Sequence, residues 1–163
     1  MFMHIWTIEK WIEYLDYDNN HYRTGLRLKF EKGIDAEVRR ACKEFCKWIR
    51  TEYYFPVRIP VYVKKSKYIK AMDGDFVNGT FFKPFNKIEE PYARIATGFY
   101  HEDLLKRGKD NSLASVLLTI AHELTHYFQW INNIQLTEIG EERQATRYAR
   151  LILDEYAQTH EHP

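Results

Sequence analysis

The segment His122-Glu123-Leu124-Thr125-His126 places two imidazole side chains four residues apart and a carboxylate beside the first. An α-helix has 3.6 residues per turn, so both histidines lie on one face and their rings can ligate the same tetrahedral Zn²⁺. Glu123 projects about 100° round that helix, from where its carboxylate can reach a metal-bound water without ligating the metal. Coincidence is the alternative, because so short a pattern also arises by chance.

Apolar residues around this segment predict a long buried helix over about 112–132. They recur at helical spacing and form one stripe, which consists of Leu113, Val116, Leu117, Ile120, Leu124, Phe128 and Ile131. On a helical wheel His122 and His126 fall opposite this stripe, about 200° and 240° from its centre. They therefore lie on a polar face, as ligands would, although two ordinary surface histidines would show the same pattern. The candidate N-caps are Asp110, Asn111 and Ser112.

A catalytic zinc site usually has three protein ligands and a fourth position for water, so one more ligand is needed. The next predicted helix, 137–158, has an apolar face formed by Ala145, Thr146, Ala149, Ile152, Leu153 and Tyr156. Glu142 lies at the centre of that face, where a carboxylate is costly to bury unless a cation compensates its charge. We therefore predict Glu142 as the third ligand. Glu138 and Glu141 are the alternatives, because the helix dipole favours any carboxylate in the first turn.

Two runs of sequence carry a family resemblance: His122–Gln129 (HELTHYFQ) and Glu142–Thr146 (ERQAT). Together they resemble the gluzincin clan of zinc metallopeptidases, with the minigluzincin-type and thermolysin-like catalytic subdomains as the nearest match. The resemblance covers about 112–158. It implies that the two histidines and Glu142 bind zinc and that Glu123 is the general base.

The same resemblance gives three further expectations. The Glu-x-x-Ala pattern of the family selects Glu142 over Glu141. The family commonly has Asp or Asn in place of Thr146, to accept a hydrogen bond from a ligand histidine. A threonine hydroxyl can accept that bond but raises the basicity of the ring less than a carboxylate does. The resemblance also assigns the upper rim of the cleft to about Tyr92–Thr97, where a substrate peptide would add as a strand.

The rest of the chain predicts an α+β fold. A helix over about 35–53 begins at the candidate cap Asp35 and closes before Pro56. Other segments are a short helix or irregular lead-in at Trp6–Leu15, strands at Thr24–Phe30, Val57–Val63, Val77–Phe82 and Ala93–Thr97, and turns at Gly74 and Gly79. We expect a small mixed sheet with a backing helix, the helix of the HExxH motif and a C-terminal glutamate helix, in a zincin-like order.

Length and charge suggest one domain. The 163 residues carry a net charge of +1, which predicts no obligatory polyanion partner. We expect 1–163 to be a single zincin-like metallopeptidase domain, with 1–20 as a lead-in and 159–163 as a flexible tail. Because no apolar run reaches the roughly 18–20 residues that span a bilayer, and no signal peptide pattern is present, we expect a cytoplasmic protein without a membrane partner.

Three further sequence features could indicate function, but we favour an ordinary structural explanation for each. Cys42 and Cys46 share an apolar helix stripe, which indicates core packing of reduced thiols and not a metal or redox site. The stretch Lys64–Lys70 lies among tyrosines that could stack on bases, but lysines also protect edge strands, so we predict a charged edge strand and no nucleic acid partner. His160-Glu161-His162 could cover a cleft, but a solvated tail is expected.

The main hypothesis is a zinc metalloendopeptidase that acts on a peptide or protein substrate. The candidates for the group that stabilises the oxyanion are Tyr127, Tyr148, Tyr156 and His101, and the sequence does not select one of them. One alternative is a zinc-stabilised, weakly or non-catalytic binding or regulatory module on the same fold. Another is a SprT-like protease that acts on DNA-bound protein.

Overall fold

The fold is built on a mixed sheet of four strands. A computed structural model describes residues 3–15, 23–87 and 89–163. The strands are β1 (Leu26–Phe30), β2 (Ile59–Lys64), β6 (Tyr92–Ala96) and β5 (Gly79–Phe82), in that spatial order. The first three run parallel, whereas β5 pairs antiparallel with β6 and forms one edge of the sheet. A separate hairpin of β3 (Ile69–Lys70) and β4 (Phe76–Val77) follows β2.

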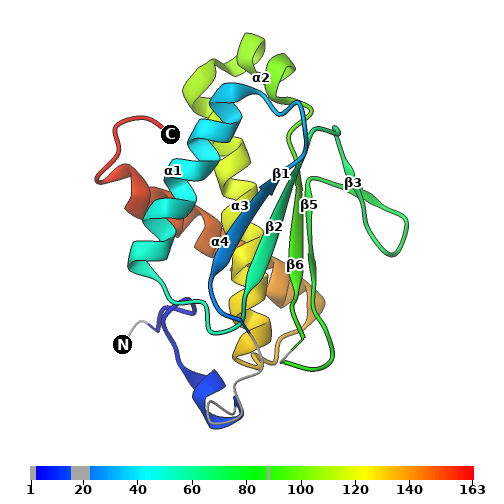
Figure 1. The fold of residues 1–163 in the computed structure, drawn as a ribbon, viewed down its shortest axis with the longest axis vertical. Helices are drawn as coiled ribbons and strands as arrows, with labels where there is room; N and C mark the ends of the chain where they lie inside the picture. Colours follow the sequence, from blue (N-terminus) through cyan, green and yellow to red (C-terminus); the bar gives the residue numbers. More distant parts are fainter. Residues whose placement is uncertain (1–2, 16–22, 88) are drawn as a thin grey trace.

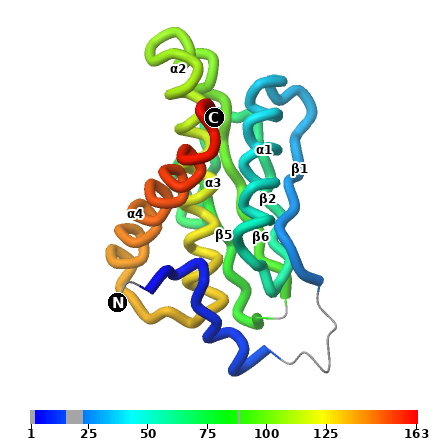
Figure 2. Tube along the Cα trace, turned by 90° about the vertical axis from the view of Figure 1, so that its left-hand side faces the viewer, coloured from blue at the N-terminus to red at the C-terminus, as the bar shows by residue number. Residues whose placement is uncertain are grey.

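Four α-helices accompany the sheet: α1 (Ala36–Glu52), α2 (Tyr100–Arg107), α3 (Lys109–Ile131) and α4 (Glu138–Ala157). Figures 1 and 2 show that α1 and α3 lie on one side of the sheet and that α4 packs on the outside of α3. A short 3-10 helix, η1 (Lys10–Glu13), occurs in the N-terminal segment. This arrangement confirms the predicted α+β class with a small mixed sheet.

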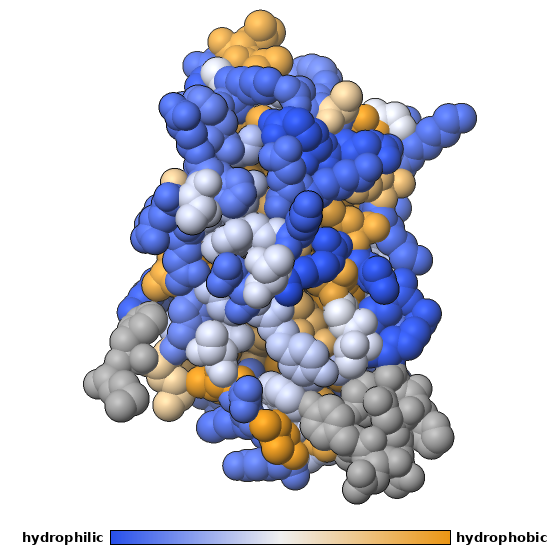
Figure 3. All heavy atoms as spheres, turned by 60° about the vertical axis from the view of Figure 1, so that its left-hand side comes forward, coloured by the Kyte–Doolittle hydropathy of each residue, from blue (hydrophilic) through white to orange (hydrophobic). Residues whose placement is uncertain are grey.

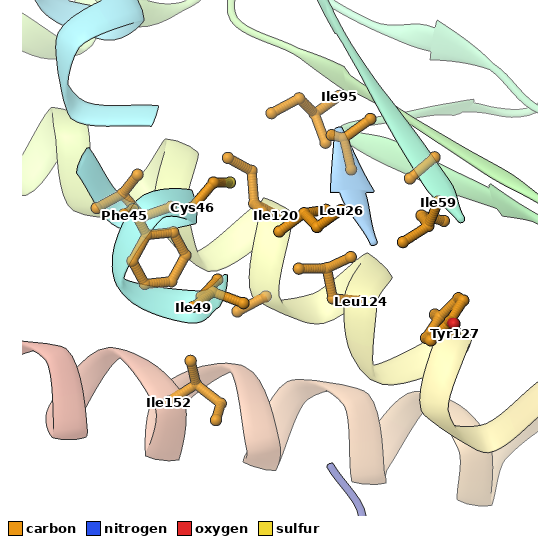
Figure 4. Close-up of a cluster of buried hydrophobic side chains, with 14 of the residues drawn as sticks. Leu26, Phe45, Cys46, Ile49, Ile59, Ile95, Ile120, Leu124, Tyr127 and Ile152 are labelled. Atoms are coloured by element: carbon orange, nitrogen blue, oxygen red, sulfur yellow. The ribbon is translucent and has the colours of Figure 1, made fainter. Parts of the chain in front are cut away.

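The core lies between the sheet, α1, α3 and α4. Figure 4 shows side chains from all four meeting: Leu26, Ile59 and Ile95 from strands, Phe45, Cys46 and Ile49 from α1, Ile120, Leu124 and Tyr127 from α3, and Ile152 from α4. Cys42 and Cys46 are free and buried, which confirms their assignment to the core. Burial raises the pKa of both thiols. On the side seen in Figure 3, hydrophilic side chains predominate and apolar ones form small separate groups.

The start of α1 follows the sequence prediction, whereas the start of α3 does not. Asp35 caps α1, because its carboxylate accepts hydrogen bonds from the backbone amides of Glu37 and Val38. Helix α3 begins three residues earlier than predicted, after Gly108 at φ 82°. The predicted caps are wrong: Asn111 and Ser112 lie inside the helix, and their side chains donate to carbonyls of the preceding turn.

Other predicted boundaries also move. The predicted strand 77–82 is divided between β4 and β5, and Gly79, predicted as a turn, is the first residue of β5. Gly74 does lie in a turn, at φ 92°. The predicted edge strand Lys64–Lys70 is wrong for the main sheet, because Lys64 ends the interior strand β2 and the rest leads into the separate hairpin. Helix α2 was not predicted.

The C-terminal segment lies against α1 and the first turn of α3. The ring of His160 stacks on Tyr156 with 4.0 Å between centroids. His162 Nδ1 lies 2.7 Å from a carboxylate oxygen of Asp110, and Arg40 donates to the carbonyl of Pro163 at 3.0 Å. The tail predicted to be flexible thus has specific contacts.

The predicted lead-in, 1–20, is described only over residues 3–15, so the rest of that prediction lies outside the described part of the chain. Within the described residues, no helix has the length and apolar character to cross a membrane.

Candidate metal centre

Helix α3 presents its histidines to a cleft while its opposite face builds the core. Leu124 is fully buried beneath the sheet, and Thr125 is buried on the side of the N-terminal segment. The hydroxyl of Thr125 accepts a hydrogen bond from the indole N–H of Trp6 at 3.0 Å. His122 and His126 lie on the face of α3 opposite Leu124, as the wheel predicts. Their two rings form a T-shaped pair with centroids 5.0 Å apart.

Helix α4 brings Glu142 to both histidines. Nε2 of His122 lies 3.0 Å from Oε2 of Glu142, and Nε2 of His126 lies 2.9 Å from Oε1 of the same carboxylate. One ligand atom from each of the three residues lies within 4.8 Å of the others. Glu141 instead lies 3.8 Å from the ammonium of Lys83, and Glu138 is exposed. The structure therefore brings together the three predicted ligands and places the two alternative carboxylates elsewhere.

Zn²⁺ fits this set of donors. Two imidazole nitrogens and a carboxylate are the donor types of a catalytic zinc site. Ligand atoms about 2.0–2.1 Å from a tetrahedral zinc are roughly 3.4 Å apart, so N–O separations of 3.0 and 2.9 Å need only a small expansion. Burial and the neighbouring His126 lower the pKa of His122, against the influence of Glu142. A lowered pKa favours the neutral imidazole that a metal requires.

Glu123 lies beside the ligands in a sheltered position. Its side chain is buried, with 5% exposure, although the residue borders the cleft. Burial, followed by the charge of Glu142, raises the pKa of Glu123 to about 8. A cation held by the three ligands acts in the opposite direction and favours the carboxylate. Glu123 thus has the location of a general base whose proton affinity depends on its neighbours.

Strand β5 approaches α3 closely at Gly79, directly over Glu123. A Cβ atom at this position would lie 2.9 Å from Cγ2 of Thr119, 3.1 Å from Cγ of Glu123 and 3.2 Å from the carbonyl oxygen of Arg94. Only glycine allows this approach without displacing Thr119, a β-branched residue with restricted rotamers. Gly79 therefore allows β5 to lie directly over Glu123, a role that the turn prediction missed.

The hydrogen bond that orients His126 comes from Gln129 and not from Thr146. Nδ1 of His126 lies 2.7 Å from Oε1 of Gln129. The amide nitrogen of Gln129 donates to the carbonyl of Glu141 and to Oε1 of Gln144, which fixes its orientation. Thr146 is exposed at the cleft and, among the described residues, makes no hydrogen bond to either histidine. Gln129 could have been identified from sequence, because it lies three residues after His126 on the same helix face.

We expect Gln129→Leu to lower zinc affinity by about 10–100-fold, the range for lost hydrogen-bond partners of metal ligands. The leucine keeps the volume but cannot accept from His126 or hold α4. Thr146→Val is the matched control and should change zinc affinity less than twofold. Competition with a chromogenic chelator measures both. Equal losses in the two variants would return the orienting role to Thr146.

The four groups considered for oxyanion stabilisation lie away from the metal ligands. The hydroxyl of Tyr127 bonds both backbone groups of Val57, and that of Tyr148 donates to the carbonyl of Met3. Tyr156 is buried against α1, and His101 lies on α2 near Asp35. None of the four lines the cleft.

A large open cleft lies in front of the ligands, with a volume of about 2080 Å³. Strand β5, the β3–β4 hairpin, α3, α4 and two residues of β6, Tyr92 and Arg94, line it. The predicted rim at Tyr92–Thr97 is wrong as a site of strand addition, because β6 already pairs with β2 on one side and β5 on the other. Strand β5 has the free edge at the cleft. The C-terminal residues 159–163 do not line the cleft.

Comparison with known proteins adds little to this geometry. No family model matches the chain. No curated protein matches it. The solution structure of TM1509 from Thermotoga maritima is similar, with 12% sequence identity, a TM-score of 0.49, and coverage of 82% of this chain and 93% of that one. A similarity at this level assigns neither a family nor a function.

Proposed function

We propose that this protein is a zinc-dependent metallopeptidase of the gluzincin type. The observation that carries the proposal is the convergence of His122, His126 and Glu142 from two helices, with Glu123 sheltered beside them at the cleft. The sequence resemblance and the donor set both support zinc. Two histidines, one carboxylate and an adjacent unligated glutamate form the arrangement used for hydrolysis by activated water.

Each residue of the site has a distinct task in this proposal. His122, His126 and Glu142 hold the ion, and Gln129 fixes the ring of His126. When bound, zinc supplies a Lewis acid that polarises the scissile carbonyl and lowers the pKa of water from 15.7 to about 7. Glu123 accepts the proton of the attacking water and passes it to the departing amine.

The edge of β5 is where an extended substrate would bind. Among the described residues no strand pairs with its outer backbone N–H and C=O groups, and the strand borders the cleft above α3. A peptide that pairs there presents its carbonyls along the ligands while alternate side chains point into and out of the cleft. Such main-chain recognition accepts many sequences, which suits an endopeptidase that cleaves unfolded segments.

Removal of the metal tests this proposal. Protein freed of metal by chelation should not cleave unfolded casein, and one equivalent of Zn²⁺ should restore cleavage, whereas Mg²⁺ should not, because it prefers oxygen ligands. Zinc should also raise the melting temperature, since it binds the folded site and not the unfolded chain. Cleavage that survives complete chelation would contradict the proposed function.

A second candidate is a zinc-stabilised binding module that cleaves little or nothing. One specific observation favours it: the aromatic and histidine side chains considered as oxyanion donors are all outside the cleft. The same experiment separates the two functions. A module gives the rise in melting temperature with zinc but no cleavage of casein or of a peptide library at any zinc concentration.

A further inference from the structure

The side of the central sheet that faces away from α1 and α3 has an unusual composition. Side chains alternate along each strand, so every second residue points to this side, which we name the open face. Its charged and aromatic residues are Arg27 and Lys29 in β1, Tyr62 and Lys64 in β2, Tyr92 and Arg94 in β6, and Phe82 in β5; Pro60, Thr80 and Ala96 complete it. All charged residues of the four strands are cations, and all of them belong to the open face.

Strand register brings the aromatic residues of the open face together. Tyr62 lies opposite Arg94 in the neighbouring strand, and Tyr92 lies opposite Phe82. The rings of Tyr62 and Tyr92 are 6.1 Å apart between centroids, and those of Tyr92 and Phe82 are 5.0 Å apart and nearly parallel, at 24°. Three strands thus contribute one continuous aromatic row across the sheet.

Cations flank this row. The ammonium groups of Lys29 and Lys64 lie 6.0 and 5.9 Å from the centroid of the Tyr62 ring. Arg27 and Lys29 are exposed on the outer strand. Arg94 donates to the carbonyl of Lys70, so the β3–β4 hairpin borders the open face.

No residue of the four strands is acidic, and Glu31 and Glu90, just outside them, have partners. Asp73 and Asp75 lie in the hairpin that borders the open face. Glu31, just after β1, accepts from the backbone amide of Lys65. Glu90, just before β6, binds Arg23 and lies 3.8 Å from Arg58. Within the described residues no helix covers this side of the sheet, since α1 and α3 both pack on the other side (Figure 1). The strands of the open face therefore carry only positive charges, around a row of aromatic rings.

We propose that the open face binds single-stranded nucleic acid. Lysine and arginine side chains match the charge of phosphates, and partly exposed aromatic rings offer stacking surfaces for unpaired bases, which a duplex does not present. Neither feature alone selects this partner, because a membrane surface or an acidic protein would need the charge but not the row of rings. The inference does not rest on the proposed peptidase function. Arg27, Lys29, Tyr62 and Lys64 lie outside the cleft, whereas Phe82, Tyr92 and Arg94 border both the open face and the cleft.

This inference reverses the expectation from the sequence that no nucleic acid partner exists. That expectation rested on the whole-chain charge of +1 and on the lysine stretch. Pairing of β1, β2, β6 and β5 concentrates cations from distant segments on one face, whereas the acids that balance them lie elsewhere. Local charge, and not net charge, governs binding to a polyanion.

Charge reversal at the outer strand tests the role of the cations. The zinc-loaded protein is titrated into fluorescein-labelled 12-mers of oligo(dT) and oligo(U), and into a duplex of the same length, with anisotropy as the readout. We expect both single strands to bind more tightly than the duplex, and the affinity ratio of DNA to RNA shows which sugar is preferred. Arg27→Glu/Lys29→Glu should weaken binding at least tenfold. The control Lys47→Glu/Lys106→Glu changes the net charge equally on exposed helix positions and should have less than a twofold effect.

Salt dependence gives a second readout of the same contacts. If four cations meet phosphates, the slope of log K against log salt is about −2.8, and the double variant should lose about 1.4 of it, at roughly 0.7 per phosphate on a single strand. Wild-type protein that binds no oligonucleotide at low salt would overturn the proposal. So would equal losses in the two double variants.

The stacking role is tested separately at Tyr62, which does not line the cleft. Tyr62→Ala should weaken single-strand binding by about fivefold or more, and Tyr62→Phe should restore it, because either ring can stack on a base. Heparin and vesicles with 30% phosphatidylserine serve as anions without bases. If they bind as tightly as the oligonucleotides, and Tyr62→Ala has no effect, the surface recognises charge alone and the proposal is wrong. An unchanged melting temperature confirms that each variant is folded.

Discussion

Glu123→Gln is expected to abolish peptide hydrolysis while zinc remains bound. Glutamine has nearly the same volume and fits the same buried site, but its amide cannot accept a proton from water. Glu123 is not one of the three metal-binding residues, so zinc content should stay at one equivalent per chain. General base catalysis typically contributes about 10²–10⁴-fold, and a loss of at least this size is expected in kcat on casein or a quenched peptide.

The matched control for this variant is Glu138→Gln, an exposed glutamate that also borders the cleft. It should retain cleavage within twofold. Metal analysis of the same samples separates lost chemistry from lost zinc. Cleavage that persists in Glu123→Gln would show that another group takes the proton, and loss of zinc in that variant would mean that Glu123 helps to hold the ion.

Glu142→Ala is expected to lower zinc affinity by more than about 100-fold, which is a larger loss than that of Gln129→Leu. Loss of a residue that only hydrogen-bonds a ligand costs at most about 100-fold, and loss of a ligand should cost more. Its carboxylate faces both histidines in the structure, at 3.0 and 2.9 Å. Removal leaves two imidazoles, too few for a stable catalytic site. Isothermal titration of the metal-free protein with Zn²⁺ measures the change.

Glu141→Ala is the control for the third ligand, since Glu141 is adjacent in sequence and lies near Lys83. Its side chain makes no contact with the histidines among the described interactions, and its backbone carbonyl, which holds Gln129, is retained by alanine. Zinc affinity should change little. A greater loss in the Glu141 variant than in the Glu142 variant would overturn the ligand assignment.

The sequence predicted the helices best where a strong apolar period or a side-chain cap defines them. The stripe of α3 and the cap Asp35 of α1 both depend on residues a few positions apart, so local geometry is sufficient. Helix α2 has only eight residues and was missed, because so short a segment offers little period to detect. The start of α3 was placed too late for the same reason, as α2 runs almost directly into it.

Sheet order was beyond the reach of the sequence. Each strand shows its own alternation, but pairing between β1, β2, β6 and β5 joins segments far apart in the chain. That is why the sequence assigns strand addition to Tyr92–Thr97 although β6 is an interior strand with partners on both sides. The open face escaped notice for the same reason, because its residues become neighbours only through strand register.

At the candidate site, residue spacing along a helix predicted which residues lie close together. It did not predict the direction in which individual side chains point. His122, Glu123 and His126 follow from helical geometry, and Glu142 follows from the face of the next helix. The choice of Thr146 to orient a histidine failed because its position on α4 does not determine where its hydroxyl points. Gln129 reaches Nδ1 of His126 at 2.7 Å instead.

The N-terminal segment contacts both helices that carry the candidate metal ligands. Trp6 donates to Thr125 of α3, 119 positions away in sequence, and Met3 accepts from Tyr148 of α4, 145 positions away. The distance between the histidines and Glu142 is therefore governed in part by a stretch that contains no ligand. If the proposed metal binds, we expect a change to residues 3–6 to alter its affinity, because loss of these two contacts would let α3 and α4 shift against each other.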